Sequence, residues 1–598
     1  MNNLKNIVLL LIDSMNNTNI KSSNLNITPF LNELKKNNVY IDDMYSQAPY
    51  TEAANMGIYC GQDTLQNGGY MFRYKYAPKT IFEAMKEKGY RTYYNDFQPQ
   101  CHISSVIRGI DDIYYSVGFD LGALWNYRLK HYSNLFKDGK LNGNDYTALY
   151  EIFNDNFIGW LHFVDNIIDI DKSIELIINN DPSYDATKVK KQVEYEYQLF
   201  NNNKKKYVDE VLLEGTNHRL FSIQPFRQVE KIKDRKFYKS IKHIFKPVCK
   251  KVRKYDFKFN KKNCKGIFKG ANRKLFQFIK KPNAINLKNY VKASLLSINQ
   301  LFDVDLYKRI NKNYDYFKNA PSLKTHIDHY IKWRKNTTDP SFCFMHVDDI
   351  HNPEVFFTYD TEDVELLKME KEAAMDVLNN IPSDYTGSLS HDLSLRYIDG
   401  VIKYFYNEME KNNFIENTII LICADHGFSF SGNPLRDSAV VNLYLENYNI
   451  PCIITGTGLE NKKIEGLFES KDIPATLCYL ADGIIPIEFS GKNVFVSKGY
   501  DKLIIEYCGG GCPDLSRREL KMAAFDKKLF VGCCLKLDED LTFDKISELY
   551  DLEKDPKQLD NLINKYDNRQ FVQEYIDLIN KRKHEILVSN KSIVNEGE

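Results

Sequence analysis

Residues 6–14 read NIVLLLIDS and residues 417–427 read NTIILICADHG, and these two stretches decide the fold class. Each contains a short, nearly uninterrupted apolar run that ends in an aspartate. Such runs, without polar alternation, are typical of strands buried on both faces of a sheet. Open α/β sheets bind their ligands beyond the carboxyl ends of the strands. We therefore expect Asp13 and Asp425 to stand at the ligand-binding edge of a sheet.

Amphipathic helical segments alternate with apolar runs along the rest of the chain. Pro favours the first turn of a helix and Gly its end, so both help to set the expected boundaries. The alternation predicts an α/β fold with a mostly parallel central sheet flanked by helices. The predicted strands are residues 7–12, 90–94, 342–346 and 418–424, and the predicted helices start at Thr28-Pro29 or cover 79–89 and 393–411.

A basic region interrupts this alternation. Residues 231–281 contain twenty Lys and Arg but only two acids, Asp234 and Asp256. We interpret residues 190–330 as a basic, mainly helical insertion. The catalytic core is then expected at 1–190 and 330–500, with a smaller C-terminal subdomain at 500–598.

Three interpretations of segment 231–281 remain open. It could form a solvated helical face, contact an anionic membrane surface, or bind a polyanionic or nucleotide-linked glycan. Sequence-specific binding of nucleic acid is disfavoured because no recognised module accompanies the charge.

The composition favours a cytoplasmic protein. The apolar run at residues 7–12 is short and ends in Asp13, which fits a first strand better than a signal peptide. The twelve cysteines are then expected to be reduced thiols. Peripheral contact with the inner membrane face through 231–281 is the alternative location. The sequence does not indicate an oligomeric state.

Three elements carry the candidate chemistry. Asp13 and the Asp425-His426 pair offer carboxylate and imidazole ligands for a divalent metal ion. Thr51 lies in the segment APYTEAANMGIYCG (48–61), which reads as a loop that enters a helix. A threonine there either caps the helix or acts as a nucleophile activated by a metal. Alternatively, the two aspartates have only a structural role and stabilise the turns that follow their strands.

Taken together, these segments resemble the alkaline phosphatase/sulfatase superfamily, and three further segments are similar to motifs of that family. The resemblance implies an alkaline-phosphatase-like α/β fold and spans most of the chain except about 190–330. The further segments are 342–353 (FCFMHVDDIHNP), 391–399 (HDLSLRYID) and 548–562 (ELYDLEKDPKQLDNL).

Departures from the sulfatase pattern bear on the reaction. A sulfatase carries Cys or Ser, later oxidised to formylglycine, where this chain has Thr51, and an arginine where it has Asn55. Ser14 replaces the second aspartate of the opening motif, and Cys60 lacks the flanking residues of the oxidation signature. The resemblance therefore favours the branch with a threonine nucleophile, which includes phosphoethanolamine and phosphoglycerol transferases and phosphodiesterases.

That resemblance implies the site. One divalent ion (Mn, Zn, Mg or Ca) would be held by Asp13, Thr51, Asp425 and His426, with Thr51 as the nucleophile. Asn55 and His351 would contact an anionic ester substrate. A second metal near His346 and Asp349 is an alternative without further support.

The predicted function is hydrolysis or transfer of a phosphate ester through Thr51. A surface-glycan or lipid-linked precursor is one candidate substrate. The alternatives are a sulfatase that hydrolyses sulfuric esters and a non-catalytic binding protein of the same fold.

Overall fold

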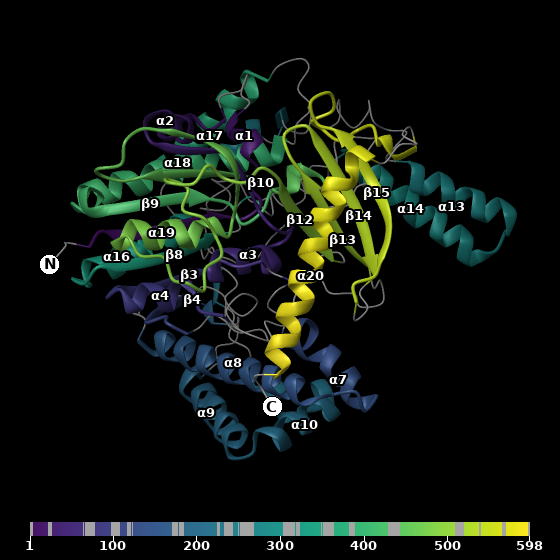
Figure 1. Cartoon of the computed structure of the whole chain (residues 1–598), viewed down its shortest axis with the longest axis horizontal. Coiled ribbons are helices and arrows are strands. Elements are labelled where there is room, and N and C mark those ends of the chain that lie inside the picture. Colours follow the sequence, from purple (N-terminus) through teal and green to yellow (C-terminus); the bar gives the residue numbers. More distant parts are fainter. Residues whose placement is uncertain are drawn as a thin grey trace.

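The chain folds into a large mixed sheet covered by helices, with a second sheet near the C-terminus (Figure 1). The structure is a computed structural model. It describes residues 4–21, 27–63, 65, 78–96, 108–115, 121, 124–169, 177–178, 185–223, 228–231, 243–248, 250–251, 268–302, 317–318, 323–347, 350, 364–381, 389–428, 443–508, 519–536, 540–564 and 570–595.

The large sheet has eight strands in the order β11-β2-β10-β9-β1-β8-β3-β4. Strand β10 pairs antiparallel with β2 and β9, whereas the other pairings in this sheet are parallel. The predicted mostly parallel sheet is therefore confirmed. The bounds are β1 Asn6–Ile12, β2 Val39–Tyr45, β3 Arg91–Asp96, β4 Asp112–Tyr115, β8 Ser341–Val347, β9 Thr418–Cys423, β10 Asn449–Thr455 and β11 Lys463–Glu469.

The direction of each crossover places helices on both faces of this sheet. Parallel strands are joined by right-handed crossovers, so connections that run in opposite directions along the sheet cover opposite faces. Helices α2 (Pro29–Asn37) and α18 (Leu389–Lys411) follow connections that run toward the β11 edge, and they pack together. Helices α3 (Thr51–Cys60) and α4 (Ile81–Glu87) lie on the connection that runs toward the β4 edge.

Central strand β1 shows why its sequence is uninterruptedly apolar. All seven of its residues are buried, because helices cover both faces of the strand.

Helix α4 shows how a local signal sets a boundary. Thr80 Oγ1 accepts a hydrogen bond from the Glu83 backbone N–H at 3.2 Å, and the Glu83 carboxylate accepts one from the Thr80 N–H at 2.9 Å. This capping box begins the helix within the predicted segment 79–89.

A four-stranded antiparallel sheet forms the C-terminal subdomain. Its strands are β12 (Leu503–Cys508), β13 (Glu519–Phe525), β14 (Leu529–Lys536) and β15 (Phe543–Asp551), and helix α20 (Gln573–Asn595) crosses it (Figure 1). The apolar cluster beneath this sheet includes Ala48, Tyr50 and Ala53. The subdomain is thus packed against the start of helix α3.

Helices dominate the described residues between 186 and 302. They include α9 (Ala186–Asn202), α10 (Lys204–Glu214), α13 (Lys269–Lys280) and α14 (Ala284–Phe302), with α9 packed on α8 (Gly143–Asp169). Two short strands, β6 (Gln228–Lys231) and β7 (Phe317–Lys318), also occur in the region expected to be the helical insertion. The domain boundaries stay a prediction.

No helix within the described ranges is both long enough and apolar enough to cross a membrane. Seven cysteines with described side chains are buried and form no disulfide: Cys60, Cys343, Cys423, Cys452, Cys478, Cys533 and Cys534.

Candidate active site and metal centre

Three neighbouring strands bring the candidate metal ligands together. Asp13 follows β1, His346 lies near the end of β8, and Asp425 follows β9. Strand β1 pairs with both neighbours, and Leu11 is in register with His346 on one side and Cys423 on the other. Strands β8 and β9, which flank β1, therefore bring His346 and Asp425 to the carboxyl end of β1, where Asp13 lies.

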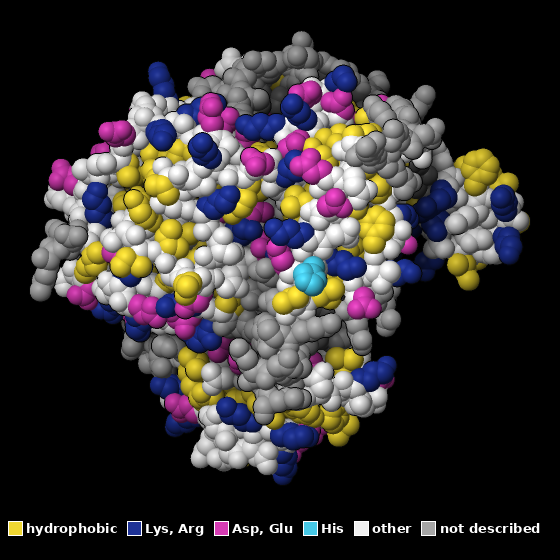
Figure 2. All heavy atoms as spheres, in the orientation of Figure 1, with side chains coloured by type: hydrophobic (Ala, Val, Ile, Leu, Met, Phe, Trp, Pro, Cys, Tyr) yellow, Lys and Arg dark blue, Asp and Glu magenta, His cyan; other side chains and the backbone are white. Residues whose placement is uncertain are grey.

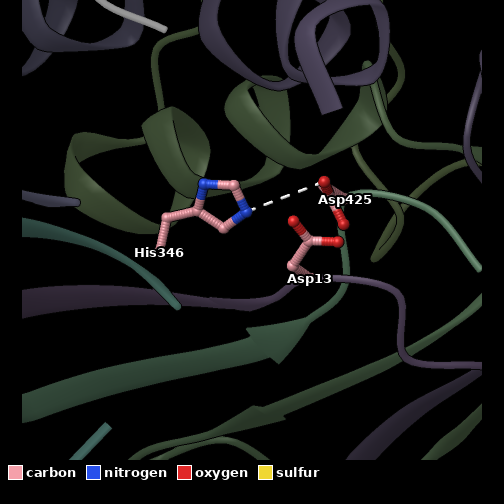
Figure 3. Close-up of side chains that lie close together, drawn as sticks. All are labelled: Asp13, His346 and Asp425. Carbon is pink, nitrogen blue, oxygen red and sulfur yellow. Dashed lines mark ion pairs between the residues drawn. The ribbon is translucent and has the colours of Figure 1, made fainter. Parts of the chain in front are cut away.

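Asp13, His346 and Asp425 each offer one ligand atom, and these atoms lie within 4.8 Å of one another. Figure 3 shows the His346 ring and the Asp425 carboxylate facing each other across Asp13, with 3.6 Å between Nε2 and Oδ2. All three side chains are buried. Asp425 Oδ2 has no hydrogen-bond partner in the described structure. Buried carboxylates and imidazoles in such an arrangement suit a divalent cation.

The backbone after Asp13 is bent to serve this centre. Ser14 adopts a left-handed conformation with φ of 66°, which is uncommon for a residue other than glycine. Its N–H donates to Asp425 Oδ1 at 3.2 Å, and its hydroxyl donates to Asp13 Oδ1 at 2.7 Å. Local strain of this kind clusters at functional sites, and here it orients both carboxylates.

Gly427 explains the third residue of the Asp-His-Gly segment. A Cβ at this position would overlap the side chain of Asn16 and the backbone carbonyl of Glu446. The Gly427 N–H donates to the Asn447 carbonyl at 2.8 Å. The close packing of this loop requires glycine, and it fixes the Asp425-His426 pair at the end of β9.

Thr51 is the first residue of helix α3 and points toward the same centre. Its Oγ1 lies 3.2 Å from Asp13 Oδ2 and 3.3 Å from His426 Nε2. His426 Nδ1 lies 2.7 Å from the Gly427 carbonyl oxygen, which can only accept a hydrogen bond. Nδ1 of His426 therefore carries a proton, and Nε2 faces Thr51 and also lies 3.5 Å from Asp425 Oδ2 and 3.6 Å from Asp13 Oδ1.

Asn55 lies one turn after Thr51 on helix α3. Its side chain is buried, and neither amide atom has a hydrogen-bond partner in the described structure. Buried amides are normally hydrogen-bonded, so an unpartnered one is a candidate ligand contact. Helix α3 also begins at Thr51, and the backbone N–H groups at a helix N-terminus favour an anion.

A sequence model of the family described as Sulfatase matches residues 5–217 and 274–484, which is more than half of the chain. This chain belongs to the sulfatase family. Its structure is similar to that of Ps i-CgsB in complex with k-i-k-neocarrahexaose, at 12% sequence identity and a TM-score of 0.50, with 97% of this chain and 93% of that chain covered. At this identity the likeness supports the shared fold alone.

Two further solved structures match with lower TM-scores. The phosphonate monoester hydrolase of Agrobacterium radiobacter is 11% identical with a TM-score of 0.49, covering 97% of this chain and 96% of that chain. A protein of the alkaline phosphatase superfamily from Vibrio parahaemolyticus is 12% identical with a TM-score of 0.41, covering 94% and 86%. The suspected superfamily is confirmed by the family match.

Another buried carboxylate, that of Asp96, lies on the side of the His346 ring that faces away from Asp425. Asp96, the last residue of β3, places Oδ2 3.5 Å from His346 Nδ1 and accepts a hydrogen bond from the Tyr94 hydroxyl at 2.5 Å. The Tyr59 hydroxyl lies 3.1 Å from that of Tyr94 and continues the network into the core. A carboxylate on the far nitrogen of a metal-binding histidine fixes the ring orientation.

Charge and burial compete at this centre. Burial lowers the pKa of His346, but Asp96 and Asp425 together raise it well above the ordinary histidine value. Burial likewise raises the pKa of Asp425, but His426 and His346 hold it below the ordinary value. The centre therefore retains charged carboxylates that can bind a cation.

The structure brings together four of the residues predicted from the sequence of this family member: Asp13, Thr51, Asp425 and His426. Asn55 lies next to them on α3. His351 and Asp349, named above for substrate and for a second metal, lie outside the described residues.

Two residues of the centre were not in the predicted ligand set. His346 was assigned only to the second-metal alternative, yet it groups with Asp13 and Asp425. Asp96 was not singled out, because the predicted strand 90–94 ended two residues before it. The observed β3 extends to Asp96, so the signal was the same as for Asp13: a carboxylate at the carboxyl end of a buried strand.

Proposed function

We propose that this sulfatase-family enzyme cleaves or transfers phosphate esters with Thr51 as the nucleophile. The observation that supports the proposal most directly is the position of Thr51 Oγ1, within 3.3 Å of two proton acceptors. A nucleophile must lie within hydrogen-bond reach of the group that takes its proton, and both Asp13 and His426 satisfy this condition.

The donor set fits one divalent metal ion. Asp13, Asp425 and an imidazole from His346 or His426 would hold it, and when bound it would lower the pKa of the Thr51 hydroxyl and neutralise charge on the substrate. The residues themselves supply the proton acceptors and the geometry. Ser14 keeps the two carboxylates in place through its backbone N–H and its hydroxyl.

The covalent steps balance as follows. The Thr51 proton moves to Asp13 or His426, Oγ1 forms a bond to phosphorus, and the bond from phosphorus to the leaving oxygen breaks. The leaving alkoxide takes up a proton, and the phosphoryl group stays bonded to Thr51 Oγ1, still carrying the second ester substituent when the substrate is a diester. Water or an acceptor hydroxyl then attacks phosphorus, the bond from phosphorus to Thr51 Oγ1 breaks, and Oγ1 regains a proton. With a phosphodiester substrate, attack by water releases a phosphate monoester, and attack by an acceptor hydroxyl gives a new diester.

The chemistry of threonine favours phosphate over sulfate esters. Formylglycine is an aldehyde, produced when the terminal carbon of Cys or Ser is oxidised. Thr51 carries a secondary alcohol, whose oxidation would give a ketone instead. An intact hydroxyl must therefore act as the nucleophile, as it does in enzymes that form a phospho-enzyme.

The non-bridging oxygens of the substrate would lie at the start of α3. Backbone N–H groups of its first turn and the unpartnered Asn55 amide offer donors to a phosphoryl group. This assigns Asn55 to the place where the sulfatase pattern has an arginine. A neutral donor there suits a phosphodiester, which carries one negative charge.

The test is turnover of bis-p-nitrophenyl phosphate and p-nitrophenyl sulfate by protein stripped of metal and resupplied with Mn²⁺ or Zn²⁺. We expect that adding the metal ion restores cleavage of the phosphate diester. In Thr51→Ala the turnover rate should fall by at least about 1,000-fold. Thr51→Ser retains a hydroxyl and is expected to keep measurable turnover. Intact-mass measurement of quenched reactions with the phosphate diester should show a p-nitrophenyl phosphoryl adduct on the wild type that Thr51→Ala lacks.

Thr147→Ala is the matched control, because Thr147 is an exposed threonine on helix α8. Its turnover is expected to equal that of the wild type. Unchanged turnover in Thr51→Ala would overturn the nucleophile assignment. Cleavage of the sulfate ester in preference to the phosphate ester would make the enzyme a sulfatase despite its threonine.

A further inference from the structure

Helices α13 and α14 form a hairpin that projects from the body of the protein (Figure 1). Residues 281–283 join the two helices, which pack chiefly against one another among the described elements. The hairpin therefore has outer faces that no described element covers. We call residues 269–302 the projecting hairpin.

The projecting hairpin exposes an unusual share of apolar surface. Seven of the seventeen exposed large apolar side chains in the described structure lie on it. Phe276 and Ile279 stand one turn apart on α13, with 66% and 63% of their surface exposed. On α14 the exposed side chains follow the spacing of one helical stripe: Leu287, Val291, Leu295 and Ile298. A concentration of exposed apolar side chains of this kind marks an interaction surface.

The same hairpin is purely cationic. Residues 269–302 contain seven Lys and Arg and no Asp or Glu. Lys280 and Lys281 are exposed at the turn, and Lys288 and Lys292 are exposed beside the stripe on α14. The ion pairs between described residues include none from these four lysines. Figure 2 shows basic and apolar side chains next to each other on the projection at the right.

We propose that the projecting hairpin docks on the surface of an anionic lipid bilayer. Apolar side chains interleaved with lysines suit an interface where acyl chains and acidic headgroups meet. Charge complementarity decides against a second copy of the chain as the occupant. Two such hairpins would bring fourteen positive charges together with no acid between them.

The experiment is co-sedimentation of the full-length protein with vesicles of phosphatidylcholine alone or with 30% phosphatidylserine, at low and high salt. We expect binding to the anionic vesicles that weakens as salt rises, and little binding to the neutral ones. Lys280→Glu/Lys281→Glu is expected to weaken binding about tenfold or more, because each basic residue near the surface contributes substantially. Phe276→Ser/Ile279→Ser tests the apolar part and should weaken binding about fivefold without changing the charge.

Two matched controls lie on the helices α9 and α10. Lys188→Glu/Lys191→Glu makes the same charge change at exposed positions of α9, and Tyr195→Ser/Leu213→Ser removes apolar side chains that are 57% and 64% exposed. Both controls should bind as the wild type does. Thermal melting should show that every variant is folded, which is expected because the replaced side chains are on the surface.

Three results would overturn the proposal. One is binding that does not depend on phosphatidylserine, and another is loss of binding in the controls to the same extent as in the hairpin variants. The third is a wild-type dimer, measured by light scattering, that Phe276→Ser/Ile279→Ser converts to a monomer, since the stripe would then be covered by a second copy. None of these outcomes depends on the proposed catalytic activity, so failure here leaves Thr51 untouched.

Discussion

The two ends of helix α3 meet two different kinds of buried charge. At its start, Thr51 faces the metal centre, where Asp425 Oδ2 has no hydrogen-bond partner in the described structure. Beyond its end, Asp63 lies in an ionic cluster, 2.8 Å from Lys471 Nζ and 2.8 Å from Arg582 Nη1. Lys471 also lies 2.7 Å from Glu469 Oε2.

The difference separates a site built for a ligand from one built for stability. Buried polar groups that lack partners are costly unless an absent group completes them, as at the start of α3. In the ionic cluster the cations and carboxylates satisfy one another. That cluster joins three parts of the chain: the loop after α3, the residue before α19 (Asp472–Asp482), and helix α20 of the C-terminal subdomain. It holds the subdomain against the core.

The strongest loss of activity is expected when a carboxylate of the metal centre is neutralised. Asp425→Asn keeps the size of the side chain but removes the negative charge that the cation needs. We expect turnover of the phosphate diester to fall at least about 10,000-fold. The rise in melting temperature that Mn²⁺ or Zn²⁺ gives the wild-type protein should also disappear.

Asp138→Asn makes the same chemical change at a carboxylate that is 58% exposed on the surface. It should retain both turnover and the metal-dependent rise in melting temperature. A normal metal response in Asp425→Asn would show that the ion is held elsewhere, and the contrast between the two ends of α3 would fail.

The next effect breaks the ionic cluster. Burial raises the pKa of Asp63, but Arg582 and Lys471 hold it below the ordinary value, so the carboxylate is charged in the folded protein. Asp63→Asn would leave two buried cations with too few partners. We expect a loss of about 3–5 kcal/mol in the free energy of unfolding. The measurement is the urea midpoint at pH 7, with Asp138→Asn expected within about 0.5 kcal/mol of the wild type.

Turnover distinguishes the two ends in this variant as well. Asp63→Asn protein that is still folded at low temperature should cleave the phosphate diester within about threefold of the wild-type rate, since the described hydrogen-bond and ion-pair partners of Asp63 are Gln47, Lys471 and Arg582, which are not residues of the metal centre. A loss as large as that in Asp425→Asn would mean that the cluster positions the catalytic residues and is not only structural.

The metal end could be predicted from sequence because its signals are local. Asp13 and Asp425 each end a buried apolar run, and parallel strands bring such ends to one edge of the sheet. His346 was harder to place, since alternation along a strand does not tell which face of β8 looks toward the ligand. Asp96 escaped because the end of a strand is the least certain part of a prediction.

The ionic cluster could not be predicted in the same way. Asp63 follows a helix, Lys471 precedes one and Arg582 lies within a third, and none of these positions has a periodicity that marks a charged residue as buried. The contacts depend on how the C-terminal sheet docks on the core, which is a tertiary arrangement between distant segments. Only the sheet, its flanking helices and the existence of a C-terminal subdomain followed from the pattern of elements.

Glu506 on β12 lies beside the ionic cluster, but its carboxyl has no hydrogen-bond partner in the described structure. This carboxyl is buried. Burial raises its pKa from 4.5 to about 8. The neighbouring carboxylates of Asp63 and Glu469 raise this pKa further, whereas the cations of Arg582 and Lys471 lower it. Glu506 therefore avoids a buried negative charge by keeping its proton, whereas the carboxylates of the metal centre are charged and suit a cation.

The sign of the pH dependence follows from the raised pKa. The folded protein keeps a proton on Glu506 that the unfolded chain releases above about pH 4.5, so the contribution of Glu506 to stability is fully present below about pH 4.5 and is lost as pH rises toward 8. Glu506→Gln cannot lose a proton, and we expect it to be more stable than the wild type by roughly 1–3 kcal/mol at pH 8. Near pH 5 the two urea midpoints should nearly coincide, because other titrating groups affect both proteins equally. Parallel profiles from pH 5 to 8 would show that the protonation of Glu506 does not change over this range, which would contradict its raised pKa.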